Sequence, residues 1–247
     1  MEYGDKHILV LGAGASGIGA SWVLAQVGAN VVLNDYKPVT LPADEEKRLV
    51  SAGVDIITGR QDESLLDGVD RIVISPGISL DIPIVKAAQA RGIDVVSEVE
   101  VAYELSKSPI VAVTGTNGKT TTTTLLTKVL EGTGKPVRVG GNIGDSLSEV
   151  AYSMPADGFL VAELSSYQLE TIKHFRPIGA IMLNITPDHL ARHKTMENYI
   201  AAKERIFENQ LSTDFMVLNI DDPIVADMKH RAPSHILEIS QHQVVSN

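Results

Sequence analysis

The chain has 247 residues, with 21 Lys and Arg against 31 Asp and Glu, and it contains no Cys. A hydrophobic fraction of 44% excludes wholesale disorder, and the lack of cysteine excludes disulfide scaffolds, thiolate zinc sites and cysteine nucleophiles. A net charge of −10 argues against a nucleic-acid or membrane partner bound through bulk charge, but it leaves room for an anion site made of backbone amides.

The first stretch without charge is residues 7–34, which contain no Asp, Glu, Lys or Arg and are long enough for a membrane span. Five glycines lie in this stretch, together with Ser16, Gln26 and Asn30. A strand, a glycine turn, a helix and a second strand explain this pattern better than a spanning helix. The N-terminus also lacks a basic segment followed by a cleavable apolar core, so we expect neither membrane insertion nor a signal peptide.

Short apolar runs alternate with amphipathic stretches along the first part of the chain. The runs at 8–11, 31–33, 54–57, 71–75 and 94–96 predict strands, and the stretches at 16–27, 43–52 and 83–91 predict helices. Near-continuous apolar strands that alternate with helices indicate a parallel sheet covered on both faces. We therefore predict a Rossmann-like α/β domain over residues 1–105.

The first predicted strand leads into a glycine loop, Gly12-Ala13-Gly14-Ala15-Ser16-Gly17, which fits the G-x-G-x-x-G pattern. Glycines allow a tight turn, and the following helix offers free N–H groups to a phosphate. Asp35 ends the second strand, where an acid commonly meets a ribose hydroxyl. A packed turn without a ligand is the alternative, but the full context favours a ligand that carries a diphosphate. By itself, Ser75-Pro76-Gly77 after the fourth strand is more simply a turn.

A second α/β series follows a polar, proline-bearing boundary at 106–109. Strands are predicted at 110–113, 136–139, 159–162, 180–183, 215–218 and 235–239, and helices at 119–130, 196–209 and 223–229. We therefore predict a P-loop ATPase-type α/β domain over residues 106–247. Because the chain stops just past a strand, we expect this domain to be incomplete at its C-terminal end.

The second series opens with a phosphate-binding pattern, Thr114-Gly115-Thr116-Asn117-Gly118-Lys119-Thr120-Thr121. It is a shorter G-x-x-G-K-T variant, because Val113 stands where the usual motif has its first glycine. In this pattern Lys119 would reach the β- and γ-phosphates, and Thr120 would hold Mg²⁺. The five threonines at 120–124 cost a helix ~3 kcal/mol relative to alanine, so helix stability does not explain them.

Three further residues are candidates for chemistry. Glu163 ends a strand where a magnesium-directed carboxylate belongs, although a solvated acid is the commoner case. His189 is either a satisfied loop histidine or a ligand that reaches the nucleotide. Lys203 either snorkels to solvent or is a partly buried amine with a lowered pKa, able to take up CO₂ as a metal-binding carbamate. It lies within an apolar helical stripe formed by Tyr199, Ile200, Ile206 and Phe207.

Taken together, seven segments resemble the Mur ligases, the cytoplasmic ATP-dependent enzymes that form amide bonds in peptidoglycan synthesis. They run in family order across nearly the whole chain, at residues 12–17, 75–77, 114–121, 140–144, 163–170, 184–189 and 199–206. The segment Glu163-Leu164-Ser165-Ser166-Tyr167-Gln168-Leu169 points to the branch that adds D-glutamate to UDP-N-acetylmuramoyl-L-alanine.

The resemblance implies that the first loop binds the UDP of the substrate and not NAD. The residues it implies for the UDP-substrate are Gly14, Ala15, Ser16, Asp35, Tyr36, Lys37, Gly77 and Asn142. Those it implies for ATP are Gly115, Thr116, Asn117, Gly118, Lys119, Thr120 and Thr121. Thr120 and Glu163 would hold one Mg²⁺, and His189 and a carbamylated Lys203 would hold another. Lys119, His189 and Lys203 are then the implied catalytic residues.

The implied reaction makes an acyl phosphate from ATP and the substrate carboxylate, which the amine of D-glutamate then attacks. The family carries a further C-terminal domain for the amino acid, so we expect this chain to be catalytically incomplete. We also expect a cytoplasmic monomer that binds no nucleic acid. Three alternatives stay open: a sister ligase that adds another amino acid, a nucleotide-binding module without catalysis, and an NAD-dependent dehydrogenase. The last leaves Lys119 and its loop unexplained.

Overall fold

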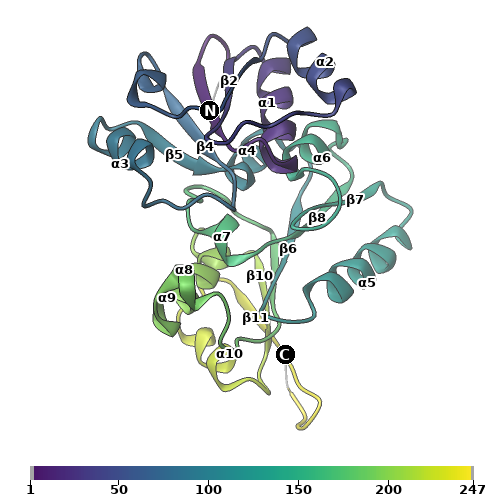
Figure 1. The fold of residues 1–247 in the computed structure, drawn as a ribbon. Helices are drawn as coiled ribbons and strands as arrows, with labels where there is room; N and C mark the ends of the chain where they lie inside the picture. Colours follow the sequence, from purple (N-terminus) through teal and green to yellow (C-terminus); the bar gives the residue numbers. More distant parts are fainter. Residues whose placement is uncertain (1–2, 246–247) are drawn as a thin grey trace.

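The computed structural model describes residues 3–245, which form two parallel sheets, one from each half of the chain (Figure 1). The first sheet has the order β3-β2-β1-β4-β5. Its strands are β1 (His7–Leu11), β2 (Asn30–Asp35), β3 (Asp55–Thr58), β4 (Arg71–Ile74) and β5 (Asp94–Ser97). Its helices are α1 (Ala15–Gln26), α2 (Ala43–Ser51) and α3 (Pro83–Ala90), with a 3₁₀ turn η1 (Glu63–Leu66).

The central strand of this sheet is buried on both faces. Ile8 and Val10 pack in one cluster with Leu24 of α1, whereas Leu9 and Leu11 pack in another with Ile84 of α3. Side chains alternate between the two faces of a strand, so burial on both faces requires a continuous apolar run. The uncharged stretch at 7–34 is thus β1, α1 and β2. No helix within residues 3–245 is long and apolar enough to cross a membrane.

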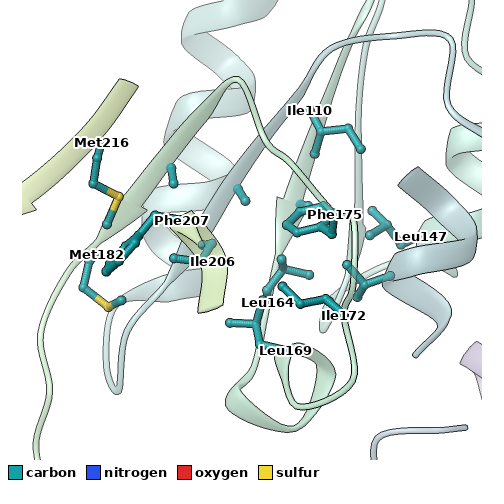
Figure 2. Packing of buried hydrophobic residues seen from close by; sticks show 14 of the residues in the cluster. Ile110, Leu147, Leu164, Leu169, Ile172, Phe175, Met182, Ile206, Phe207 and Met216 are labelled. Atoms are coloured by element: carbon teal, nitrogen blue, oxygen red, sulfur yellow. The ribbon is translucent and has the colours of Figure 1, made fainter. Parts of the chain in front are cut away.

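The second sheet has the order β11-β10-β9-β6-β8-β7. Its strands are β6 (Ile110–Thr114), β7 (Val137–Gly141), β8 (Phe159–Glu163), β9 (Gly179–Met182), β10 (Phe215–Asn219) and β11 (His235–Ile239). Its helices are α5 (Lys119–Glu131), α6 (Leu147–Ser153), α7 (Ser166–Leu169), α8 (Leu190–His193), α9 (Met196–Glu204) and α10 (Pro223–Asp227), with 3₁₀ turns η2 (Arg205–Phe207) and η3 (Met228–His230). Figure 2 shows part of its core, where Phe175, Met182 and Phe207 pack with their neighbours.

Helix α4 (Glu98–Leu105) connects the two sheets and carries two buried carboxylates. Oε1 of Glu98 accepts hydrogen bonds from the Ser146 hydroxyl at 2.6 Å and the Ser148 amide at 2.8 Å, and burial raises the pKa of Glu98. Glu100 accepts hydrogen bonds from the backbone amides of residues 173, 174 and 175. Polar side chains of α4 therefore fix loops of the second sheet against the first half of the chain.

The predicted fold class is confirmed: both halves are α/β with parallel sheets, and no strand pair in residues 3–245 is antiparallel. The helix predicted at 196–209 is shorter, because α9 ends at Glu204 and continues as η2. Four helices, α4, α6, α7 and α8, lie in segments where no helix was predicted. The domain boundary between residues 105 and 106 stays a prediction.

Candidate functional site

The glycine loop after β1 is held by contacts that only glycine permits. Gly12 has a φ of +100°, and a Cβ there would lie 2.7 Å from the Ser75 hydroxyl oxygen. The Ser75 hydroxyl donates to the Gly12 carbonyl at 3.2 Å, so the turn after β4 is joined to this loop. Gly14 is the N-cap of α1 and makes no side-chain capping bond. The N-terminus of α1 therefore keeps free amides beside the turn, as an anion site needs.

Asp35 joins the glycine loop to a neighbouring cavity. Its Oδ2 accepts a hydrogen bond from the Ala13 amide at 3.0 Å, and its Oδ1 accepts one from the Lys37 amide at 2.9 Å. The cavity has a volume of about 640 Å³ and is lined by Asp35, Tyr36, Lys37, Gln61, Gly77, Ile78, Ser79, Ile82, Pro83 and Ile84. Four residues predicted for the UDP-substrate, at the end of β2 and in the turns after β2 and β4, thus line one cavity. Gly14, Ala15 and Ser16 lie at the adjoining N-terminus of α1.

Asn142, the eighth residue predicted for the UDP-substrate, lies instead at the edge of the second sheet. Its amide side chain donates to Oε1 of Glu163 at 2.7 Å, and its backbone amide donates to the Glu163 carbonyl at 2.8 Å. Glu163 is fully buried, and its Oε2 has no hydrogen-bond partner among the residues that the structure describes. A buried carboxylate oxygen without a partner is costly unless a cation or a donor completes it.

The phosphate-binding loop lies between β6 and α5. Gly118 is the N-cap of α5 with a φ of +83°, and no side chain of residues 3–245 caps the helix. The amine of Lys119 lies over the loop, where it donates to the carbonyls of Gly115 at 3.0 Å and Thr116 at 2.9 Å. The loop residues 115–121 are therefore brought together around a lysine and the positive end of a 13-residue helix.

Lys203 on α9 reaches the same loop from the other side. Its amine donates to the Gly115 carbonyl at 2.8 Å and lies 3.4 Å from the Thr114 hydroxyl oxygen. The side chain is only 2% exposed, so it does not snorkel to solvent. Burial, and secondly the charge of Lys119, lower the pKa of Lys203 to about 7. A lysine in this state supplies an uncharged amine near neutral pH, which is the form that reacts with CO₂.

His189 lies on the exposed rim of this region. Its backbone has a φ of +54°, its Nε2 is 3.4 Å from Oδ2 of Asp188, and its ring packs against Tyr167 at 4.9 Å between centroids. Within residues 3–245, no group of three or more His, Cys, Asp or Glu side chains is arranged to hold a metal ion. Glu163 and His189 therefore belong to no such cluster. A metal ion bound by either residue would need further ligands other than His, Cys, Asp and Glu side chains.

Two polar residues near these sites were given no role from the sequence, although Asn184 opens the segment 184–189 that resembles the family. Gln61 lines the first cavity and donates to Oδ1 of Asn34 at 3.0 Å. Asn184, two residues after the end of β9, makes hydrogen bonds to the backbone of the phosphate-binding loop. It also lines a second cavity of about 430 Å³, together with Asn117 and Gly118. The position of Asn184 after a predicted strand was a usable signal, but its partner lies 67 residues earlier in the chain.

Comparison with known proteins gives matches over both halves. The model for the Mur ligase middle domain matches residues 113–245, and the model for the Mur ligase MurD-like N-terminal domain matches residues 6–97. A UDP-N-acetylmuramoylalanine--D-glutamate ligase from Caldanaerobacter subterraneus subsp. tengcongensis is 46% identical over 247 residues, which is 100% of this chain and 55% of that protein. One from Halalkalibacterium halodurans is 44% identical over 246 residues, which is 100% of this chain and 54% of that protein.

The chain thus spans about half the length of the curated relatives it matches. Among solved structures, a UDP-N-acetylmuramate:L-alanyl-gamma-D-glutamyl-meso-diaminopimelate ligase from Neisseria meningitides has a TM-score of 0.65 and 21% sequence identity. The alignment covers 95% of this chain and 78% of that chain, and it supports the fold.

Proposed function

This chain belongs to the Mur ligase family, and from that premise we propose that it binds the two nucleotide substrates of a D-glutamate-adding ligase of peptidoglycan synthesis. The cavity beside Asp35 would take the uridine of UDP-N-acetylmuramoyl-L-alanine, and the loop at α1 would take its diphosphate. The phosphate-binding loop at α5 would take ATP. We further propose a cytoplasmic, monomeric protein without a nucleic-acid partner.

One observation carries this proposal: two lysines and an uncapped helix meet at the phosphate-binding loop, close to the ends of β6 and β8. Lys119 and Lys203 both donate to the Gly115 carbonyl, so their amines share one site. Lys119 and the positive end of α5 concentrate positive charge where a triphosphate would lie, with the amine of Lys203 beside them, and phosphoryl transfer depends mainly on positioning and charge stabilisation. A nucleotide fold without chemistry does not require a second, buried lysine there.

The reaction proposed for the whole protein has two steps. A carboxylate oxygen of the L-alanyl group attacks the γ-phosphorus of ATP, the bond to the β,γ-bridging oxygen breaks, and ADP leaves with an acyl phosphate formed. The amine of D-glutamate then attacks the carbonyl carbon, loses a proton, and phosphate leaves through a tetrahedral intermediate. In the first step Lys119 and the amides of α5 would hold the phosphates and balance their charge.

The residues at the loop fit a divalent cation. Oε2 of Glu163, which has no hydrogen-bond partner in residues 3–245, offers a buried oxygen ligand, and Thr120 is the second residue of α5. A carbamate on Lys203, made from the neutral amine and CO₂ with release of a proton, would offer a second anionic ligand, with His189 as its partner. Mg²⁺ held by these two pairs would neutralise the phosphate charge that develops in transfer.

Thermal shift tests the two binding sites on this chain. We expect UDP and ATP–Mg²⁺ each to raise the melting temperature, because a ligand that binds only the folded state stabilises it. Lys119→Ala should abolish the shift with ATP–Mg²⁺ and leave the shift with UDP unchanged. Stabilisation by NAD but not by UDP would refute the ligase assignment, and equal loss of both shifts in Lys119→Ala would refute two separate sites.

Carbamylation of Lys203 is tested by ¹³C NMR of the chain in ¹³C-labelled bicarbonate. We expect a carbamate signal in the wild type that is absent in Lys203→Ala and present in Lys119→Ala. In the complete enzyme, Lys203→Ala should lose activity that a small carboxylic acid partly restores. Full activity of Lys203→Ala, or a labelled signal that survives the substitution, would contradict the assignment.

A further inference from the structure

Asn184 makes three hydrogen bonds to the phosphate-binding loop. Its side-chain Oδ1 accepts from the Asn117 amide at 2.8 Å, and its Nδ2 donates to the Asn117 carbonyl at 3.0 Å. Its own carbonyl accepts from the Thr116 amide at 2.9 Å. A single side-chain amide thus satisfies both backbone groups of Asn117, in the way that a paired strand would. No second side chain in residues 3–245 binds either group of Asn117.

This pairing lies immediately before the start of α5. In a regular helix the Asn117 carbonyl would accept from the amide of Thr121, four residues later. Here that carbonyl is bound by Asn184, and the first bond of α5 runs from the Thr122 amide to the Gly118 carbonyl at 3.0 Å. As at any helix N-terminus, the first amides of α5 lack an intrahelical partner, and in the described chain the amides of residues 118–121 have no protein acceptor. Four free N–H groups therefore point out of the N-terminus of α5.

We propose that Asn184 is a positioning residue that holds the loop so that these four amides face the phosphates of a nucleotide. This inference rests on the proposed function, since it assigns a role at the ATP site. It differs from the simple pattern of the loop, in which each backbone amide of the motif cradles phosphate. The amides of Thr116 and Asn117 are bound by Asn184, so they hold the loop, and the amides of residues 118–121 bind the ligand.

A pair of matched variants separates this role from plain stabilisation. Asn209 also uses its side-chain amide to hold distant backbone, donating to the carbonyls of Lys173 at 3.0 Å and Phe175 at 3.1 Å. Both asparagines are half-buried and belong to the second half of the chain. We expect Asn184→Leu and Asn209→Leu to lower the melting temperature by similar amounts. Only Asn184→Leu should weaken binding of ATP–Mg²⁺ and of inorganic tripolyphosphate, by about tenfold in calorimetric titration.

Hydrogen exchange of the unliganded chain gives a readout that needs no nucleotide. The Asn117 amide should be protected in the wild type and in Asn209→Leu, and it should exchange faster in Asn184→Leu. Asn184→Ala repeats the test with a smaller side chain if Asn184→Leu does not fold. Equal affinity of Asn184→Leu and wild type for tripolyphosphate would overturn the proposal. A wild type that binds neither triphosphate would instead overturn the proposed ATP site, and the role of Asn184 with it.

Discussion

At the scale of single residues, Lys203 links burial to a pH dependence that can be measured. Burial and the nearby Lys119 lower the pKa of Lys203 from 10.5 to about 7, while Asp188 opposes the shift. Between about pH 7 and pH 10.5, the amine of Lys203 is protonated in the unfolded chain and deprotonated in the folded chain. Stability therefore rises with pH in this window, and below it the full cost of burying the charged amine remains.

Lys203→Met removes this titration and keeps a side chain of similar length. In buffer free of CO₂, we expect the free energy of unfolding of the wild type, relative to Lys203→Met, to rise between about pH 7 and pH 10. The slope should approach 1.4 kcal/mol per pH unit at most, or about one proton. Urea denaturation at several pH values measures it. A difference that does not change with pH would mean that the amine stays charged in the folded chain.

The residues of the candidate site were predictable where they are neighbours in sequence. The phosphate-binding loop and the glycine loop follow from local pattern, because a turn is specified by adjacent residues. The helical stripe around Lys203 indicated burial only as one of two alternatives. The pairs Asn142–Glu163 and Asn117–Asn184 were not predictable, since each joins the ends of two different strands. Only the strand order of the sheet decides which ends become neighbours.

At the scale of elements, the helices and strands that could be predicted are those with a clear local sequence pattern. Strands buried on both faces give continuous apolar runs, so their positions followed from the sequence. Helices α7 and α8 have four residues each, which is too short for a helical period to appear. Helix α4 carries acids where a core helix normally has apolar residues, because Glu98 and Glu100 are buried against backbone and hydroxyl donors. The charged residues of α4 therefore wrongly suggest an exposed segment.

Helix α5 provides a prediction at this scale, because its threonines have separable roles. Thr124 is exposed, and its hydroxyl donates to the carbonyl of Thr120 at 2.8 Å. A threonine at such a position makes the helix less stable than alanine would. We expect Thr124→Ala to raise the free energy of unfolding by about 0.5 kcal/mol without changing ATP–Mg²⁺ affinity. Urea midpoints and calorimetry measure the two effects. Thr120→Ala is the matched variant, and it should lose the Mg²⁺ dependence of binding. Destabilisation by Thr124→Ala would contradict this account of the helix.

At the scale of the whole molecule, helices of the two halves pack against each other. Helix α6, drawn in green, lies against the purple α1 of the first half (Figure 1). Arg48 of α2 bridges to Glu149 of α6 at 2.7 Å and stacks over Trp22 of α1 at 4.9 Å. Together with the carboxylates of α4, these contacts fix the orientation of the two candidate nucleotide sites relative to each other.

Gly19 on α1 tests how closely this junction is packed. A Cβ at Gly19 would overlap the side chain of Ser146 and lie 2.7 Å from Oε2 of Glu149. In an ordinary helix, Gly→Ala stabilises by about 1 kcal/mol. Here we expect Gly19→Ala to destabilise by about 1–3 kcal/mol, because Ser146 must leave its bond to buried Glu98. Gln26→Ala, at the exposed end of the same helix, should be near neutral in the same urea titration. If Gly19→Ala stabilised the chain instead, α1 and α6 would not be in close contact, and the two sheets would not be held in one fixed orientation.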